Sequence, residues 1–328
     1  MKHCALFAFL LAACGGTDSA TIPDGSDETG NGGDASPGND ASASNDGTTS
    51  TDGSSSDGTI TFDGGGFNPA TVSGLVLWLE ADVGASLVQQ NNRITQWKDQ
   101  TTHANNANGN TNSTTQNRNP MLKKGQINGV DAVHFDKGQT NGPANMLVVT
   151  DNQDKSLQWG TGDFYVAIVG EFDNDPNDSS GSSFAVGNFF SKNMANQQTF
   201  TGVAFYGNLP TSQNTQTAGL LFMTSNGLND FAYTATAYNN DKPHVFAIRR
   251  QGSAIDLYVD GASINSATAT TNIDVSNASL PVRIGADGDA NLLRLDGDIG
   301  EIYAVEGALS SSDQTNIQAY LKKKWGTP

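Results

Sequence analysis

The chain has 328 residues, and its 17 lysines and arginines against 34 aspartates and glutamates give a formal net charge of −17. Such an acidic chain lacks the clustered cations that bind phosphates, so nucleic acid is excluded as a partner. Only 36% of the residues are hydrophobic and 37 are glycine, so part of the chain is not expected to form a packed globule.

Residues 1–13 have the pattern of a secretory signal peptide, in which one lysine precedes an apolar run too short to span a bilayer. The run ends in the sequence LAAC, which resembles the lipobox of bacterial lipoproteins. The resemblance implies that Cys14 carries the lipid after cleavage, and Gly15 after it is similar to lipoproteins sent to an outer membrane. We therefore expect an exported lipoprotein, at the outer membrane or cell surface, whose membrane partner is reached through the lipid anchor. An ordinary signal peptide with a chance cysteine is the alternative.

Residues 14–66 are predicted to be a disordered, lipid-anchored linker. Between Gly15 and Gly66, 42 of 52 residues are Gly, Ser, Thr, Asp or Asn, ten are acidic and none is Lys or Arg. Such a segment buries too little apolar surface to offset its ordering entropy. Because no cysteine follows Cys14, no disulfide can stabilise the rest of the chain, which must rely on a large core or on bound ions.

Residues 67–328 are predicted to form one all-β domain, because short apolar or alternating runs recur between polar turns. One run, 164–169, is apolar throughout, as expected of a strand covered on both faces. The predicted strands are 75–80, 132–135, 164–169, 201–206, 219–224, 244–249, 255–260, 282–284 and 299–305.

One helix is predicted near the C-terminus. Ser311 and Gln314 have the spacing of a capping box, and apolar residues from Ile317 to Trp325 recur at helical spacing. Three lysines, 322–324, lie in the last turn, where the helix dipole and solubility explain them. A basic patch that touches the membrane is the alternative interpretation.

Five segments, taken in order, resemble the laminin-G-like branch of the concanavalin A-like lectin/glucanase superfamily. They are SGLVLWLEADVGAS, ITQWKDQTTHANNANG, NGVDAVHFD, HVFAIRRQGSAIDLYVDGASINSAT and LDGDIGEIYAVEGALSSSDQTNIQAYLKKKWG. The resemblance implies a jelly-roll sandwich of two antiparallel sheets with one C-terminal helix. In that family the usual function is carbohydrate or protein binding, and the fold alone does not choose between them.

The same superfamily contains glucanases with paired carboxylates on one strand, which raises a glycoside hydrolase as a second hypothesis. The nearest sequence here is EFDND from Glu171, where Pro176 ends any strand and a solvated loop is the favoured interpretation. Glu80 and Glu301 lie on other predicted strands, so either could pair with a carboxylate across a sheet. The weak catalytic candidates are therefore Glu80, Glu171 and Glu301, and we favour a protein that is not an enzyme.

Calcium is the one cofactor that the sequence suggests, because this lectin-like class often binds it and acidic residues are frequent near residue 290. An irregular calcium site would use Asp287, Asp289, Asp296 or Asp298, whereas a solvated acidic turn is the favoured interpretation. His134 and His244 lie in predicted strands and are interpreted as packing or hydrogen-bonded residues.

Sugar binding requires exposed aromatic faces beside polar groups. The candidates are Trp159, Tyr206 and Tyr238, in segments rich in Asn and Gln. The resulting hypothesis is a surface-displayed binding or adhesion module, with a glycan as the first ligand class and a surface protein as the second. A passive structural or protein-interaction component is the remaining alternative.

Overall fold

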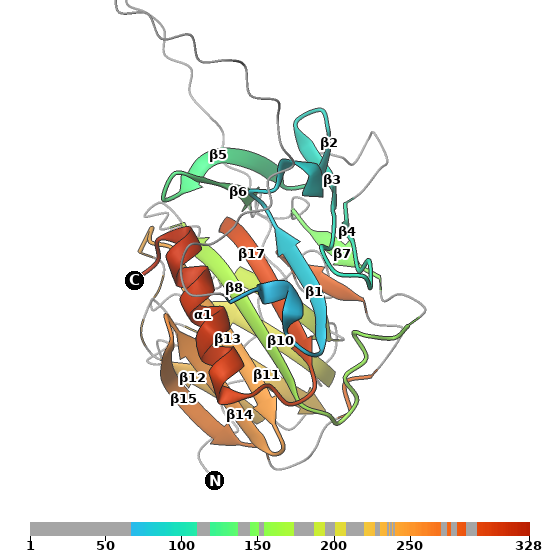
Figure 1. Ribbon diagram of the computed structural model, residues 1–328, viewed down its shortest axis with the longest axis vertical. Helices are drawn as coiled ribbons and strands as arrows, with labels where there is room; N and C mark the ends of the chain where they lie inside the picture. The colour runs from blue at the N-terminus through green and yellow to red at the C-terminus, as the bar shows by residue number, and fades with distance from the viewer. Residues whose placement is uncertain are drawn as a thin grey trace, which may run out of the picture. The chain divides into compact units, whose positions relative to one another are not determined.

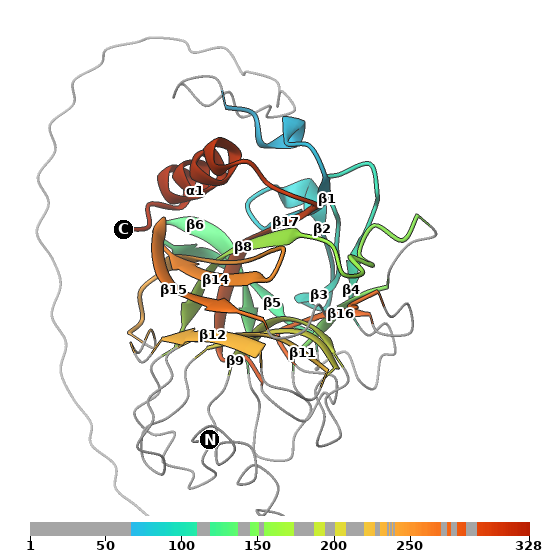
Figure 2. The same ribbon diagram turned by 90° about the horizontal axis from the view of Figure 1, so that it is seen from below.

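The apolar run at residue 164 forms β8 (Phe164–Phe172), and all nine of its residues are buried. This strand pairs with β13 (His244–Gln251) on one side and β17 (Gly297–Glu306) on the other. A strand is apolar on both faces when both faces of its sheet are covered. The arrangement in Figure 2 agrees, because a helix lies on one side of this sheet and a second sheet on the other.

The computed structural model describes most of the predicted all-β domain. The described residues are 67–109, 119–136, 145–150, 154–173, 187–193, 201–207, 220–226, 230–234, 236, 238, 240–269, 274–276, 281–286 and 294–328. The predicted signal peptide, Cys14 and the predicted linker lie outside them. Within these ranges, no helix combines the length and apolar character needed to cross a membrane.

Sheet A has eight antiparallel strands in the order β15-β14-β13-β8-β17-β6-β5, and β1 also pairs with β17 (Figure 1). Its other strands are β1 (Leu75–Glu80), β5 (Met121–Ile127), β6 (Val130–Phe135), β14 (Ala254–Val259) and β15 (Ala262–Thr268).

Sheet B has nine antiparallel strands in the order β12-β11-β10-β9-β16-β7-β4-β3-β2. They are β2 (Leu87–Gln90), β3 (Arg93–Trp97), β4 (Ala107–Asn108), β7 (Leu147–Val149), β9 (Gly187–Asn193), β10 (Thr201–Gly207), β11 (Leu220–Asn226), β12 (Asp230–Thr234) and β16 (Val282–Ile284). Two short 3-10 helices, η1 (Pro69–Thr71) and η2 (Gly84–Ser86), flank β1. The predicted sandwich of two antiparallel sheets is confirmed.

The predicted C-terminal helix is α1 (Ser311–Trp325), and it lies on the outer face of sheet A. Its N-cap is Ser310, whose Oγ accepts a hydrogen bond from the backbone N–H of Asp313 at 3.0 Å. The capping pair therefore begins one residue earlier than the Ser311 that the sequence indicated. The helix ends at Gly326, which has a φ of 62° and so takes the left-handed conformation that glycine adopts without a Cβ penalty.

Aromatic side chains join the two sheets in the core. The ring of Phe189 on β9 lies 4.4 Å from that of Phe172 on β8, 5.8 Å from that of Phe205 on β10 and 5.2 Å from that of Phe246 on β13 (centroid distances). All four rings are buried. A core built from both sheets supplies the cohesion that the absence of disulfides demands.

A β-bulge at Gly300 sets which side chains of β17 face outward. Opposite β8, Asp298 pairs with Glu171 and Glu301 pairs with Val169, so one extra residue of β17 lies between these pairs. Asp298 and Glu301 are three residues apart and would face opposite sides of a regular strand, but the bulge brings both to the outer face. The ring of Trp325 at the end of α1 packs on Gly300, where a Cβ would lie 2.6 Å from a ring carbon.

We predict that Gly300→Ala lowers the free energy of unfolding by about 1–3 kcal/mol, because the added methyl group displaces a fully buried indole. The measurement is urea denaturation. Gly84→Ala is the matched control, since a Cβ at Gly84 would meet nothing within 4 Å, and it should change stability by less than about 0.5 kcal/mol. Equal stability of the two variants would contradict the close packing of α1 on the bulge.

Candidate functional site

A row of ionisable side chains crosses three neighbouring strands of sheet A. Asp298 on β17 lies opposite His134 on β6 and opposite Glu171 on β8. Directly opposed residues in antiparallel strands point to the same face, so these three side chains share the outer face of the sheet. Asp173, two residues after Glu171, stands at the end of β8, where its backbone N–H donates to the carbonyl of Asp296 at 3.1 Å.

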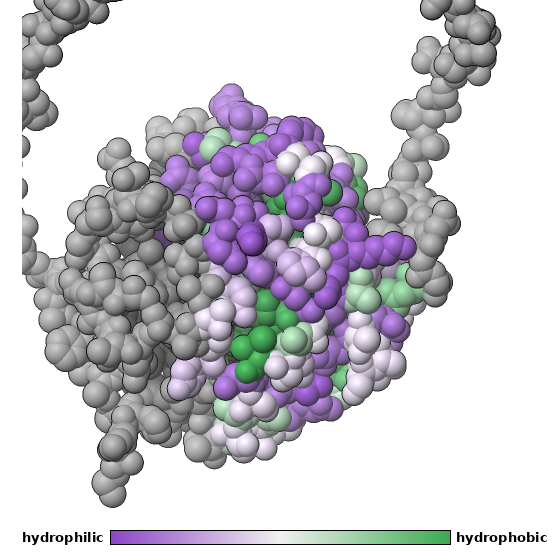
Figure 3. Space-filling view, turned by 90° about the vertical axis from the view of Figure 1, so that its left-hand side faces the viewer, coloured by the Kyte–Doolittle hydropathy of each residue, from purple (hydrophilic) through white to green (hydrophobic). Residues whose placement is uncertain are grey.

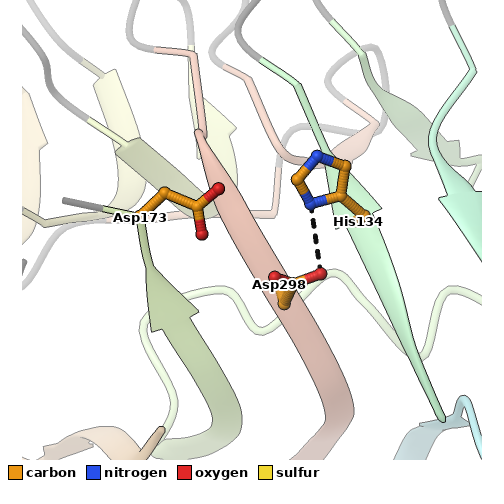
Figure 4. A group of neighbouring side chains, drawn as sticks. All are labelled: His134, Asp173 and Asp298. Atoms are coloured by element: carbon orange, nitrogen blue, oxygen red, sulfur yellow. Dashed lines mark hydrogen bonds and ion pairs between the residues drawn. The ribbon is translucent and has the colours of Figure 1, made fainter. Parts of the chain in front are cut away.

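His134, Asp173 and Asp298 converge closely enough to hold one metal ion (Figure 4). Each offers a ligand atom, and these atoms all lie within 4.8 Å of one another. The Nδ1 of His134 lies 3.2 Å from Oδ1 of Asp298. The other oxygen of Asp298, Oδ2, has no hydrogen-bond partner. Water cannot supply one easily, because the whole residue has 0% of its surface exposed.

Burial and mutual repulsion disfavour ionised carboxyl groups in this row. Burial first, and then the charges of Asp298, Asp173 and Asp241, raise the pKa of Glu171 to about 7. Burial and the charge of Asp298 also raise the pKa of Asp173, against the lowering effect of His134. Carboxyl groups whose ionisation is this costly would be stabilised by an added cation.

The structure places the four predicted metal residues differently. Asp298 is at the centre of the row, and Asp296 lies close enough for its charge to raise the pKa of Asp173, but it is not one of the three converging residues. Asp287 and Asp289 lie outside the described residues. The sequence missed His134 and Asp173 as ligands, since pairing between distant strands brings them together. It also predicted a solvated loop at Glu171, which is wrong because this residue is buried within β8.

Two of the three catalytic candidates form a facing pair, but α1 covers it. Glu80 on β1 lies opposite Glu301 on β17, and Lys324 of α1 is ion-paired with both, at 3.0 Å from Glu301 and at short range from Glu80. Lys324 also lies 3.0 Å from Asp82. The indole N–H groups of Trp78 and Trp325 donate to the two oxygens of Glu301 at 2.7 and 2.8 Å.

This carboxylate cluster docks the helix and is closed to substrate. Glu80 is 5% exposed and Glu301 0% exposed. Burial, followed by the charge of Glu301, raises the pKa of Glu80 to about 7 despite the opposing effect of Lys324. For Lys324, burial alone would lower the pKa, but Glu301, Glu80 and Asp82 together raise it. The explanation of this lysine by helix dipole and solubility is therefore wrong, because its side chain is buried in an ion-pair network.

The predicted sugar-binding aromatic residues are not available as ligand faces where the structure describes them. Trp159 is 3% exposed and stacks on Phe164 at 4.4 Å, and Tyr238 is 8% exposed and packs edge-on against Phe246. The side chain of Tyr206 lies outside the described residues. Sequence reasoning missed Tyr233 on β12, whose 49% exposure is the largest among the described large hydrophobic residues. The alternation of Asp230–Thr234 gives no signal that would separate it from a buried strand tyrosine.

The comparisons with known proteins agree with this fold. Residues 171–313 match the family model described as the concanavalin A-like lectin/glucanases superfamily. No curated protein matches the chain in sequence. The domain thus has a concanavalin A-like fold, as the sequence resemblance implied.

Three solved structures illustrate the structural similarity. The binding domain of Paraclostridial Mosquitocidal Protein 1 is 12% identical with a TM-score of 0.53, over 78% of this chain and 55% of that chain. The binding domain of botulinum neurotoxin serotype D is 11% identical with a TM-score of 0.47, over 78% and 54%. Domain 4 of AbnA, a GH43 arabinanase from Geobacillus stearothermophilus in complex with arabinotriose, is 13% identical with a TM-score of 0.46, over 75% and 99%. This chain spans about half the length of the two toxin domains.

We predict that Lys324→Met destabilises the protein by about 3–5 kcal/mol at pH 8, because it leaves buried carboxylates without their cation. The deficit should shrink at pH 5. With a folded pKa near 7 against an ordinary value of 4.5, Glu80 contributes its full stability below about pH 4.5 and loses it as the pH rises through 7. Removing Lys324 makes that loss larger. The measurement is urea denaturation at both pH values.

Lys323→Met is the matched control, since Lys323 occupies the same helical turn with an exposed side chain. It loses only a favourable interaction with the helix dipole, worth less than about 1 kcal/mol. A Lys324→Met deficit that equals this control, or that grows on acidification, would contradict the docking role of the cluster.

Proposed function

We propose that the protein is a lectin-like binding module that recognises carbohydrate and does not hydrolyse it. The superfamily description covers both lectins and glucanases, so the state of the carboxylate pairs distinguishes the two. The observation that carries the proposal is the burial of Glu80 and Glu301 beneath α1, where they are held by Lys324. A glycosidase needs both carboxyl groups beside the scissile bond.

The second facing pair, Glu171 and Asp298, also argues against hydrolysis. The two residues are directly opposed on neighbouring strands, and the pKa of Glu171 near 7 would suit a general acid. However, Asp298 has no exposed surface, so no anomeric carbon can approach it as a nucleophile would require. A hydrolase that uses the carboxylates of this sheet is thus the weaker candidate function.

Two surface features support a glycan as the ligand class. Tyr233 projects from β12, the terminal strand of sheet B, between the buried residues Ala232 and Thr234. An exposed aromatic ring on a rigid strand gives a flat face for the apolar side of a sugar ring. The face in Figure 3 is predominantly hydrophilic over the described residues, and its hydrophobic residues form only small, separate areas. A surface of this kind lacks the apolar centre of a permanent protein interface.

The proposal also draws on the similarity, at a TM-score of 0.53, to the binding domain of Paraclostridial Mosquitocidal Protein 1. We extend it to location: the lipobox at Cys14 and the acidic linker 14–66 would display the module at an outer membrane or cell surface. As a free coil, the linker would average roughly 40 Å from end to end. That distance lets the domain reach a ligand clear of the lipid surface, whether the ligand is a glycan or a surface protein.

We predict that residues 67–328 bind members of a glycan array and release no reducing ends from the same polysaccharides. Tyr233→Ala should weaken binding about tenfold, in line with the 1–3 kcal/mol that aromatic stacking contributes elsewhere. Val88→Ala, at another exposed apolar side chain, is the control that should keep full binding. Reducing ends that appear with the native protein and vanish in Glu171→Gln would instead establish the hydrolase, and a blank array would favour a protein partner.

We predict that labelled fatty acid is incorporated into the full chain and that Cys14→Ser abolishes the incorporation, since a thioether requires the thiol. The measurement is radiolabelling in a bacterial host followed by membrane fractionation. Cys4→Ser is the control and should retain the label, because Cys4 lies within the segment that cleavage removes. Incorporation that survives Cys14→Ser would contradict the anchor.

A further inference from the structure

We propose that His134, Asp173 and Asp298 form a binding site for a divalent transition metal ion of the Zn²⁺ or Mn²⁺ kind. The site shares only Asp298 with the expected calcium site, and it differs from that site in its chemistry. Calcium takes oxygen ligands, whereas an imidazole nitrogen beside carboxylates suits zinc, manganese and related ions. This inference does not depend on the proposed glycan-binding function.

The separation of two of the ligand atoms fits a common ion. Two ligands at about 2.1 Å from one metal, at angles between octahedral and tetrahedral, lie about 3.0–3.4 Å apart. The observed separation of His134 Nδ1 and Asp298 Oδ1 is 3.2 Å. Asp173 completes a group within 4.8 Å, and Figure 4 shows its carboxylate on the opposite side of Asp298 from the imidazole.

A second observation points to a missing ligand independently of the clustering of acidic groups. The Oδ2 atom of Asp298 is buried without a hydrogen-bond partner in a residue that has 0% exposure. Leaving such an acceptor unsatisfied is costly, and more so when it is charged. Figure 4 shows this second oxygen turned toward Asp173. An ion between the two carboxylates would satisfy it.

The charge of the surroundings favours a cation. Asp173 lies near Asp298 and Asp296, with His134 and Lys123 as the opposing groups, and Glu171 adds a further carboxyl on the same face. These six residues comprise four carboxyl groups against one lysine and one histidine. A dication would offset this excess in a site where water is largely excluded.

A second His–Asp pair in sheet A shows what a purely structural pair looks like. His244 Nδ1 lies 2.7 Å from Oδ2 of Asp260, while Oδ1 of Asp260 accepts from the backbone N–H of Val245 at 2.9 Å. Both oxygens of this carboxylate are therefore satisfied. Among the described residues, the group around His134 is the one cluster that meets the distances for a metal, and the pair at His244 is not part of it.

Metal binding here would join β6, β8 and β17 and stabilise a domain that has no cysteine after Cys14. The experiment uses the full chain without a polyhistidine tag, treated with EDTA and then titrated with Zn²⁺, Mn²⁺, Ca²⁺ or Mg²⁺. At a metal concentration 100 times the Kd, native-state binding should raise Tm by about 5 °C or more. Co²⁺ should give visible absorption bands typical of a nitrogen- and oxygen-ligated ion.

Asp173→Asn and His134→Gln should each weaken Zn²⁺ binding at least tenfold in calorimetric titration and remove the Tm shift. His244→Gln is the matched control and should keep the Kd. Asp173 is only half-buried, so Asp173→Asn should fold even if changes at the buried residues do not. The proposal is overturned by no Tm shift with any transition metal, by a shift with Ca²⁺ alone, or by unchanged Zn²⁺ affinity in Asp173→Asn.

Discussion

The ion-pair network around Lys324 is the interaction on which the outer layer of the domain depends. Helix α1 buries apolar side chains from Ile317 to Trp325, but its inner face also carries the polar side chains of Gln314 and Gln318, so apolar packing is only part of what holds it. Lys324 also reaches the facing Glu80 and Glu301, and Trp325 packs on the bulge while its indole donates to Glu301. The covered outer face in turn explains why the first six residues of β8, 164–169, can be apolar throughout.

The same network buries Glu80 and Glu301, which the sequence offers as candidate catalytic residues. Two carboxyl groups that face each other at short range are what a retaining hydrolase needs. Here that arrangement is combined with a buried cation and two indole donors, which make it a structural element. Fold and carboxylate pairing are thus insufficient evidence of enzymatic activity. A pair of carboxylates can act on a substrate only if it is accessible to that substrate.

The elements most visible in the sequence are those with a buried face. The predicted strands correspond to β1, β6, β8, β10, β11, β13, β14, β16 and β17, and the helix to α1. Strands such as β5 and β15 were missed because their residues are largely polar and partly exposed, which removes the alternation that marks a strand. The metal candidate was missed for another reason. His134, Asp173 and Asp298 are brought together by strand pairing and by the bulge at Gly300, and no local pattern encodes either.

The bulge links the two charged clusters of sheet A. By placing Asp298 and Glu301 on one face, it sets two groups of buried carboxylates along the same strand. At Glu301 the chain provides the balancing cation itself, through Lys324. At Asp298 the facing partner is an imidazole, which carries a charge only when protonated, and one carboxylate oxygen remains unsatisfied. Buried carboxylates persist when they are paired or coordinate a metal. The contrast between these two clusters along β17 is therefore the strongest structural reason to expect that the cluster at Asp298 obtains its cation from solution.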